Sequence, residues 1–167
     1  MKKTFKFCPL CGTSLRRGSI EGSKRQFCPK CGWIHYENPL PVAVAAAINS
    51  RGQVLVVKRN LNPGINQWSL PGGFVEVKET SQEACLRELK EETGINGRIN
   101  KLVGVYIHKT RMYGSLLVIG YSVKVLSKNI VISSEIKEAK FASRSKLPHI
   151  PFPSHQKILK EVYKQCR

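Results

Sequence analysis

The chain has 167 residues, and its composition of 41% hydrophobic and 23% charged residues is that of an ordinary globular protein. No stretch approaches the roughly eighteen apolar residues of a membrane span, and Cys8, Pro9 and Cys11 stand where a secretory signal would need its apolar run. We therefore expect a cytoplasmic protein that is not bound to a membrane. The 28 Lys and Arg against 11 acids give a net charge of +17, which favours an anionic, phosphate-bearing partner.

Two Cys-x-x-Cys pairs lie at the start of the chain, each followed by glycine: Cys8 with Cys11, and Cys28 with Cys31. Two such turns match a tetrahedral zinc site, in which four thiolates leave no position for water or substrate. Two disulfides are the alternative, which a cytoplasmic chain disfavours. The spacing predicts a structural zinc ribbon over residues 1–35, and the Asn-Pro step predicts a linker at 36–39.

A mixed α/β domain is expected over residues 40–167, and its elements follow from hydrophobic patterning. Apolar runs predict strands at 40–48 and 53–59, joined by a hairpin turn at 49–52. Pro71, Gly72 and Gly73 predict a loop, and the following residues favour a helix over 79–93 that Gly94 would end. The last expected elements are strands at 102–109, 115–126 and 138–143, and a final helix capped by Ser154.

The acids of the chain are concentrated in one segment. All 11 are Glu, and six of them lie between Glu76 and Glu92. Because helix positions three and four apart are neighbours, Glu88, Glu91 and Glu92 would lie close together. A solvated surface helix is the default interpretation of such sequence. The preceding glycine loop instead favours a divalent-cation site, since hard cations prefer carboxylate and carbonyl oxygens.

The same segment resembles a complete Nudix box: Gly73, five residues, Glu79, seven residues, and then RELKEETGI from Arg87 to Ile95. The resemblance implies a Nudix-type α/β/α sandwich with a mixed sheet. The cysteine module before it is similar to that of the zinc-ribbon subgroup of Nudix pyrophosphatases. The implied activity is Mg²⁺- or Mn²⁺-dependent hydrolysis of the pyrophosphate bond of a nucleoside diphosphate derivative such as FAD, NADH or ADP-ribose. Clustered cations suit this reaction because they neutralise charge on the phosphate oxygens.

The resemblance also implies roles for individual residues, position by position. Glu88 would be the base or a metal ligand, and Arg87 would orient it. Glu79 would in turn hold Arg87. The other metal ligands would be Glu91, Glu92 and the carbonyl oxygen of Gly72.

The substrate is weakly specified by the sequence. The Ser-Gln-Pro-Trp-Pro-Phe-Pro stretch of NADH pyrophosphatases does not follow the box, and Thr110 and Arg111 stand where many ADP-ribose hydrolases have a proline. Arginine forks suit phosphate and aromatic rings suit a base, with solvated charge and core packing as the alternatives. On these grounds the candidate substrate contacts are Arg59, Phe74, Tyr106 and Arg111. The resemblance to Nudix enzymes implies an additional carboxylate on a late loop, for which Glu135 or Glu138 is the candidate, with a surface role as the alternative.

Two other functions stay open at this point. A nucleoside triphosphate pyrophosphohydrolase would share the box and differ in releasing pyrophosphate. A nucleic-acid-binding or RNA 5′-end-processing Nudix protein would use the basic segments on both sides of the acids, although no aromatic interleaving is evident in the sequence. The expected partner is a small-molecule nucleotide, with nucleic acid and a homodimer kept open.

Overall fold

The computed structural model describes residues 5–127 and 129–164. The chain divides into two compact units, Met1–Pro39 and Leu40–Arg167. The first unit is a three-stranded antiparallel sheet of β1 (Arg16–Ile20), β2 (Ser23–Phe27) and β3 (Ile34–His35), in that order. Its two cysteine turns end at Gly12 and Gly32, whose φ angles of 72° and 75° are left-handed, as glycine allows without strain.

The second unit contains a seven-stranded mixed sheet. Five of its strands follow the order β10-β5-β4-β9-β8, and the other two are short: β6 pairs with β5, and β7 pairs with β4. The neighbours β4 and β9 are parallel, and the other pairs are antiparallel. The strands are β4 (Leu40–Ile48), β5 (Val54–Arg59), β6 (Trp68–Ser69), β7 (Gly72–Phe74), β8 (Gly97–Thr110), β9 (Gly114–Val125) and β10 (Ile136–Ala142). The helices are α1 (Ser81–Thr93) and α2 (Pro153–Lys164), with a short 3-10 turn η1 at Arg144–Lys146.

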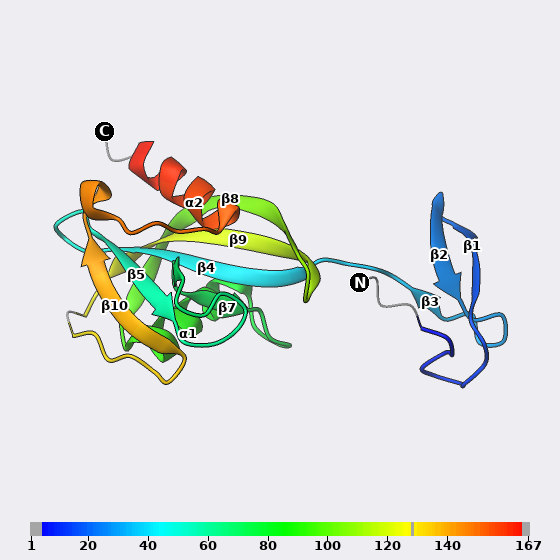
Figure 1. Cartoon of the computed structure of the whole chain (residues 1–167). Coiled ribbons are helices and arrows are strands. Elements are labelled where there is room, and N and C mark those ends of the chain that lie inside the picture. Colours follow the sequence, from blue (N-terminus) through cyan, green and yellow to red (C-terminus); the bar gives the residue numbers. More distant parts are fainter. Residues whose placement is uncertain (1–4, 128, 165–167) are drawn as a thin grey trace. The chain divides into compact units, whose positions relative to one another are not determined.

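The two helices cover opposite faces of this sheet (Figure 1). Because successive side chains of a strand point to opposite faces, Val44 and Ala46 of β4 pack on the α2 side, and Ala43, Ala45 and Ala47 pack on the α1 side. Both faces are buried, which explains why β4 is apolar throughout its central part. The α/β/α sandwich with a mixed sheet is confirmed.

The structure differs from the sequence expectations at three places. The glycines of the expected loop form β7, which pairs with β4. Strand β8 begins at Gly97, since residues from Gly97 to Ile99 pair with β9. Helix α2 begins at Pro153, so Ser154 lies inside its first turn; a fixed φ makes proline a favourable first helical residue. Within the described residues, no helix has the length and apolar character that crossing a membrane requires.

Candidate active site and metal centre

Helix α1 is positioned by its first turn. The side chain of Thr80 accepts a hydrogen bond from the Glu83 backbone N–H (3.2 Å), and the Glu83 carboxylate accepts one from the Thr80 N–H (2.7 Å). This capping box satisfies two backbone donors that the helix leaves unpaired. At the other end Gly94 adopts a left-handed φ of 68° and donates its N–H to the Lys90 carbonyl. These caps fix where the helix begins and ends, and they thereby fix the positions of its glutamates along the helix.

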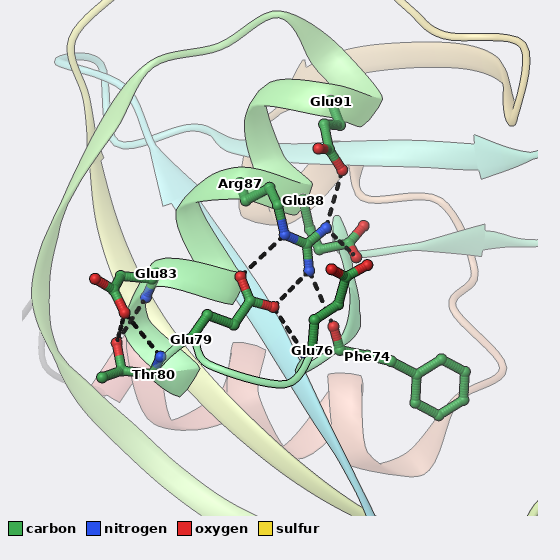
Figure 2. A network of polar contacts seen from close by, with 8 residues as sticks. All are labelled: Phe74, Glu76, Glu79, Thr80, Glu83, Arg87, Glu88 and Glu91. Carbon is green, nitrogen blue, oxygen red and sulfur yellow. Dashed lines mark hydrogen bonds and ion pairs between the residues drawn. The ribbon is translucent and has the colours of Figure 1, made fainter.

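Arg87 is the hub of the polar network on α1 (Figure 2). Its guanidinium donates two hydrogen bonds to Glu79, at 3.0 and 2.7 Å, in the fork geometry that suits a carboxylate. A second amino group donates to Glu88 (2.8 Å) and to Glu91 (2.9 Å). The guanidinium also donates to the carbonyl of Phe74 (3.1 Å), which ties the end of β7 to the helix.

The glycines before α1 allow its carboxylates to approach the sheet. Glu92 accepts a hydrogen bond from the Gly72 N–H (3.0 Å), and the carboxylate of Glu88 lies directly against Gly73. A methyl group at Gly73 would overlap that carboxylate, and one at Gly72 would overlap the Ala43 carbonyl of β4. Packing against backbone thus requires glycine at Gly72, and a larger residue at Gly73 would displace the Glu88 carboxylate.

Burial makes the carboxylates of Glu88 and Glu92 costly to ionise. The pKa of Glu92 is raised to about 8, mainly by burial and in part by the nearby Glu88, against the hydrogen bond from Gly72. Burial also raises the pKa of Glu88, although Arg87 opposes the shift. By contrast, Arg87 lowers the pKa of Glu79 to about 2. A bound divalent cation would offset the cost for the first two carboxylates, so this pair fits a cation site.

The third glutamate of the cluster points elsewhere. Glu91 is 60% exposed, and its carboxylate is directed at Arg87 (Figure 2). Among the described residues, the four ribbon cysteines are the set of three or more ligands whose atoms all lie within 4.8 Å of one another. The three glutamates do not converge to that degree.

A cleft of about 380 Å³ opens beside these carboxylates. Glu88, Glu92 and Gly72 line one wall, and Phe74 and Tyr113 form an edge-to-face aromatic pair with ring centroids 5.2 Å apart. Such a pair offers a flat apolar wall to a base. The cleft thus combines carboxylates, which suit a cation, with aromatic rings, which suit a nucleoside.

Two of the four candidate substrate residues line this cleft, namely Arg59 and Phe74. The Nε–H of Arg59 donates to the carbonyl of Pro63 (2.9 Å). Tyr106 packs against the core on the α2 side, with the Lys157 ammonium 5.8 Å from its ring centroid. Arg111 is exposed in the turn between β8 and β9. Neither Tyr106 nor Arg111 is among the described residues that line the cleft.

The cleft also gathers residues that are distant in the sequence: Glu135 was a candidate for an additional carboxylate, and His108 and His155 carried no interpretable signal. Glu135, His108 and His155 come from a loop, β8 and α2, and the fold brings them to the same cleft. The Nδ1 of His155 accepts a hydrogen bond from the Leu70 N–H (3.1 Å), so its proton is on Nε2. The pKa of His155 is lowered to about 3, mainly by burial and in part by the neighbouring His108 and Arg59. It is therefore a neutral histidine at physiological pH.

The four cysteines of the first unit fit a zinc ion. The Sγ atoms of Cys8 and Cys31 lie 3.6 Å apart, and those of Cys11 and Cys28 lie 3.5 Å apart. These separations are too long for disulfides. They are close to the edge of about 3.8 Å expected for a tetrahedron with zinc–sulfur bonds of about 2.3 Å.

Two family comparisons match the two units. The NUDIX domain family matches residues 38–166, and the Nudix N-terminal family matches residues 6–37. The chain therefore belongs to the Nudix family and carries its N-terminal zinc ribbon. It is a Nudix pyrophosphohydrolase, as the box predicted.

Individual relatives support this assignment. An ADP-ribose pyrophosphatase of Methanocaldococcus jannaschii is 38% identical over 121 residues, which are 72% of this chain and 71% of the relative. The NAD-capped RNA hydrolase NudC of Deinococcus radiodurans is 26% identical over 99% of this chain, which spans 59% of that relative's length. A crystal structure of a NUDIX hydrolase from Nitrosomonas europaea superposes with a TM-score of 0.80 at 28% identity, over 97% of this chain and 93% of that one.

Proposed function

We propose that this Nudix pyrophosphohydrolase cleaves the pyrophosphate bond of ADP-ribose or of a related dinucleotide such as NADH or FAD. The observation that carries the proposal is the cleft lined by the carboxylates of Glu88 and Glu92 and by the Phe74–Tyr113 pair. The first feature suits a cation and its phosphates, and the second suits a base. The 38% identity to an ADP-ribose pyrophosphatase supports the same substrate class.

The catalytic cation is proposed to be Mg²⁺ or Mn²⁺, because the carboxylates of Glu88 and Glu92 and the Gly72 carbonyl are hard oxygen donors. Glu88, Glu92 and the Gly72 carbonyl would hold it, and Glu91 would join them only by turning away from Arg87, which it meets at 2.9 Å. When bound, the cation supplies neutralisation of the charge on the phosphate oxygens.

The chain's own residues would do the remaining work. Glu88 accepts a proton from the attacking water, which adds to one phosphorus atom while the bridging oxygen leaves with the other. Arg87 holds Glu88 in place, and Glu79 holds Arg87, as their hydrogen bonds at 2.8 and 2.7 Å indicate. Arg59 faces the cleft as a cationic partner for phosphate.

A substrate panel with product identification tests the proposal. Purified protein is incubated with Mg²⁺ or Mn²⁺ and with ADP-ribose, NADH, FAD or a nucleoside triphosphate, and the products are separated by anion-exchange chromatography. We expect ADP-ribose to yield AMP and ribose 5-phosphate, with turnover lost in Glu88→Gln. Release of pyrophosphate from triphosphates, without a mononucleotide from any dinucleotide, would replace the proposal with a triphosphate hydrolase.

RNA with a nucleotide cap is a second candidate substrate. The NAD-capped RNA hydrolase of Deinococcus radiodurans aligns with 99% of this chain, which includes the ribbon. The chemistry would be the same, since the cap contains a pyrophosphate bond. Incubation with NAD-capped RNA and analysis of the 5′ end tests this candidate, and unchanged caps would remove it.

A homodimer is also proposed. Three large apolar side chains of β8 are between 50% and 59% exposed, namely Leu102, Val105 and Ile107. Such an exposed apolar patch is unusual on a strand and is typical of an interaction surface. Light scattering after size-exclusion chromatography tests this, and the mass of a single chain at micromolar concentration would contradict it.

A further inference from the structure

The sheet of the zinc ribbon has one face that gathers cationic and polar side chains. Strand pairing places Arg17 opposite Gln26 and Ser19 opposite Lys24, while Gln26 is also opposite His35. Residues paired directly across strands lie on the same face of a sheet, and all five line a groove of about 560 Å³. We call this groove, defined by Arg17, Ser19, Lys24, Gln26 and His35, the ribbon groove.

An aromatic cluster adjoins the ribbon groove at His35. The ring of Trp33 stacks on His35 with an interplanar angle of 27° and a centroid distance of 5.7 Å. Phe5 meets both rings edge-on, at 4.9 Å from His35 and 6.2 Å from Trp33. Gln26 holds Phe5 in place by donating to its carbonyl (2.7 Å) and accepting from its N–H (3.2 Å). The rings are thus fixed by the same sheet that forms the groove.

The cations of the ribbon groove are available to a ligand. Arg17 and Lys24 are exposed, and neither forms an ion pair within residues 5–127 and 129–164. The carboxylate of Glu21 is engaged by Arg25 at 3.7 Å. Glu37 is the one acid among the described residues that line the groove. Residues 1–39 contain eight Lys and Arg against these two acids, so the unit stays cationic even with a zinc tetrathiolate charge of about −2.

We propose that the ribbon groove binds single-stranded nucleic acid. Phosphates would lie on Arg17 and Lys24, and an unpaired base would stack at the Trp33–His35 end. Every base has a face that can stack on an aromatic ring, and the neighbouring cations attract the backbone, so the combination favours single strands over duplex. The sequence alone did not indicate this aromatic platform, because Phe5 lies 28 positions before Trp33. The fold brings the two rings together.

This binding is independent of the proposed hydrolysis, and the test keeps the two apart. Full-length protein is titrated without Mg²⁺ into a twelve-nucleotide single-stranded RNA that has a 5′-hydroxyl, no pyrophosphate and a 3′ fluorophore. Fluorescence anisotropy is recorded at several salt concentrations, and an RNA duplex of the same length is titrated in parallel. We expect the single strand to bind at least tenfold more tightly than the duplex and than a mononucleotide competitor.

Charge variants test the place of binding. The double variant Arg17→Gln, Lys24→Gln removes two phosphate contacts, so the slope of log affinity against log salt should fall by about 1.4. Arg16→Gln is the matched control, because Arg16 is exposed on the same strand and pairs with Phe27 outside the groove. It should leave the slope within about 0.3 of wild type. An equal loss per charge removed, which is about 0.7 for Arg16→Gln, would show attraction by overall charge and would overturn the proposal.

The aromatic contribution has its own readout. Trp33→Leu should weaken single-strand binding roughly tenfold, while Trp33→Phe should retain most of it and lose the RNA-induced quenching of tryptophan fluorescence. Zinc content checks that each variant is folded. Absence of binding at low salt, or equal affinity for duplex and single strand, would contradict the proposal. The hydrolysis of ADP-ribose by the charge variants should be unchanged, so failure of one proposal does not mimic failure of the other.

Discussion

Glu92 has a carboxylate, which is most stable in its ionised form in water, yet the residue is only 6% exposed. The single backbone N–H of Gly72 does not offset its burial, and its pKa is raised to about 8. An uncompensated buried charge of this kind is costly, so a cation partner is the simplest reason for its position. Burial also raises the pKa of Glu88, whose carboxylate lies between Arg87 and Gly73.

Removing either of these charges should slow the reaction. We expect Glu88→Gln and Glu92→Gln to lower kcat roughly 10²- to 10³-fold, because each carboxylate acts mainly in the transition state. Circular dichroism should show an unchanged fold. Glu138→Gln is the control, since Glu138 is exposed on β10 and pairs with Lys140 at 3.3 Å. Wild-type rates in both box variants would end the assignment of these carboxylates.

His155 should make the stability of the second unit depend on pH. Its pKa is about 3 in the folded state and about 6.5 when exposed, so below pH 6.5 the unfolded chain binds more protons than the folded one. The free energy of unfolding should therefore fall as the pH falls from 6.5 toward 3. Between pH 7 and pH 5 we expect a loss of about 2 kcal/mol from this residue. Urea titrations of wild type and His155→Gln measure it as the difference in their pH slopes, and parallel slopes would contradict it.

At the scale of elements, α1 and β7 form one functional piece. The capping box at Thr80 sets where the helix starts. The Arg87 guanidinium joins the helix to β7 by donating to the Phe74 carbonyl (3.1 Å). The alanines of β4 on the α1 side leave room for the helix to lie close to the sheet. Small residues on β4 and β7 thus allow large charged ones on α1 to reach the cleft.

The cap can be tested without touching the cleft. Thr80→Ala removes the side-chain oxygen that accepts from the Glu83 N–H, and should lower the free energy of unfolding by about 1 kcal/mol. Thr80→Ser keeps the oxygen and should lose only a small part of this. Chemical denaturation of the three proteins gives the comparison. An alanine variant as stable as wild type would show that the cap is dispensable.

At the scale of the molecule, two units meet different physical requirements. The second has buried apolar layers on both faces of its sheet. The first is a small unit whose buried residues include Cys8 and Cys28. A segment of this size rarely folds on hydrophobic burial alone, so a metal is needed to stabilise it.

We therefore expect Cys28→Ser to unfold the first unit and leave the second folded. Elemental analysis should find one zinc per chain in the wild type and little in the variant, while hydrolysis at saturating substrate continues. Cys85→Ala is the control, because Cys85 is buried on α1 and belongs to the other unit. A Cys28→Ser protein that stays folded but has no turnover would place the ribbon in the chemistry.

Short-range chemistry could be predicted from the sequence. Two Cys-x-x-Cys pairs imply a zinc site because each turn presents two thiolates, and the spacing of Arg87, Glu88, Glu91 and Glu92 implies one helical cluster. Both are properties of a few consecutive residues. The alternating and apolar runs likewise indicated most of the strands, with their ends displaced wherever pairing with a neighbour extended them, as in β8.

Convergence of distant residues required the fold. His108, Glu135 and His155 share a cleft because β8, the loop before β10 and α2 meet there. This arrangement depends on the sheet order β10-β5-β4-β9-β8, which no local pattern encodes. The same holds for the cluster of Phe5, Trp33 and His35 in the ribbon. Tyr106 lies in the core for the converse reason, since an aromatic residue in a strand has two possible faces, and only packing against α2 selects one.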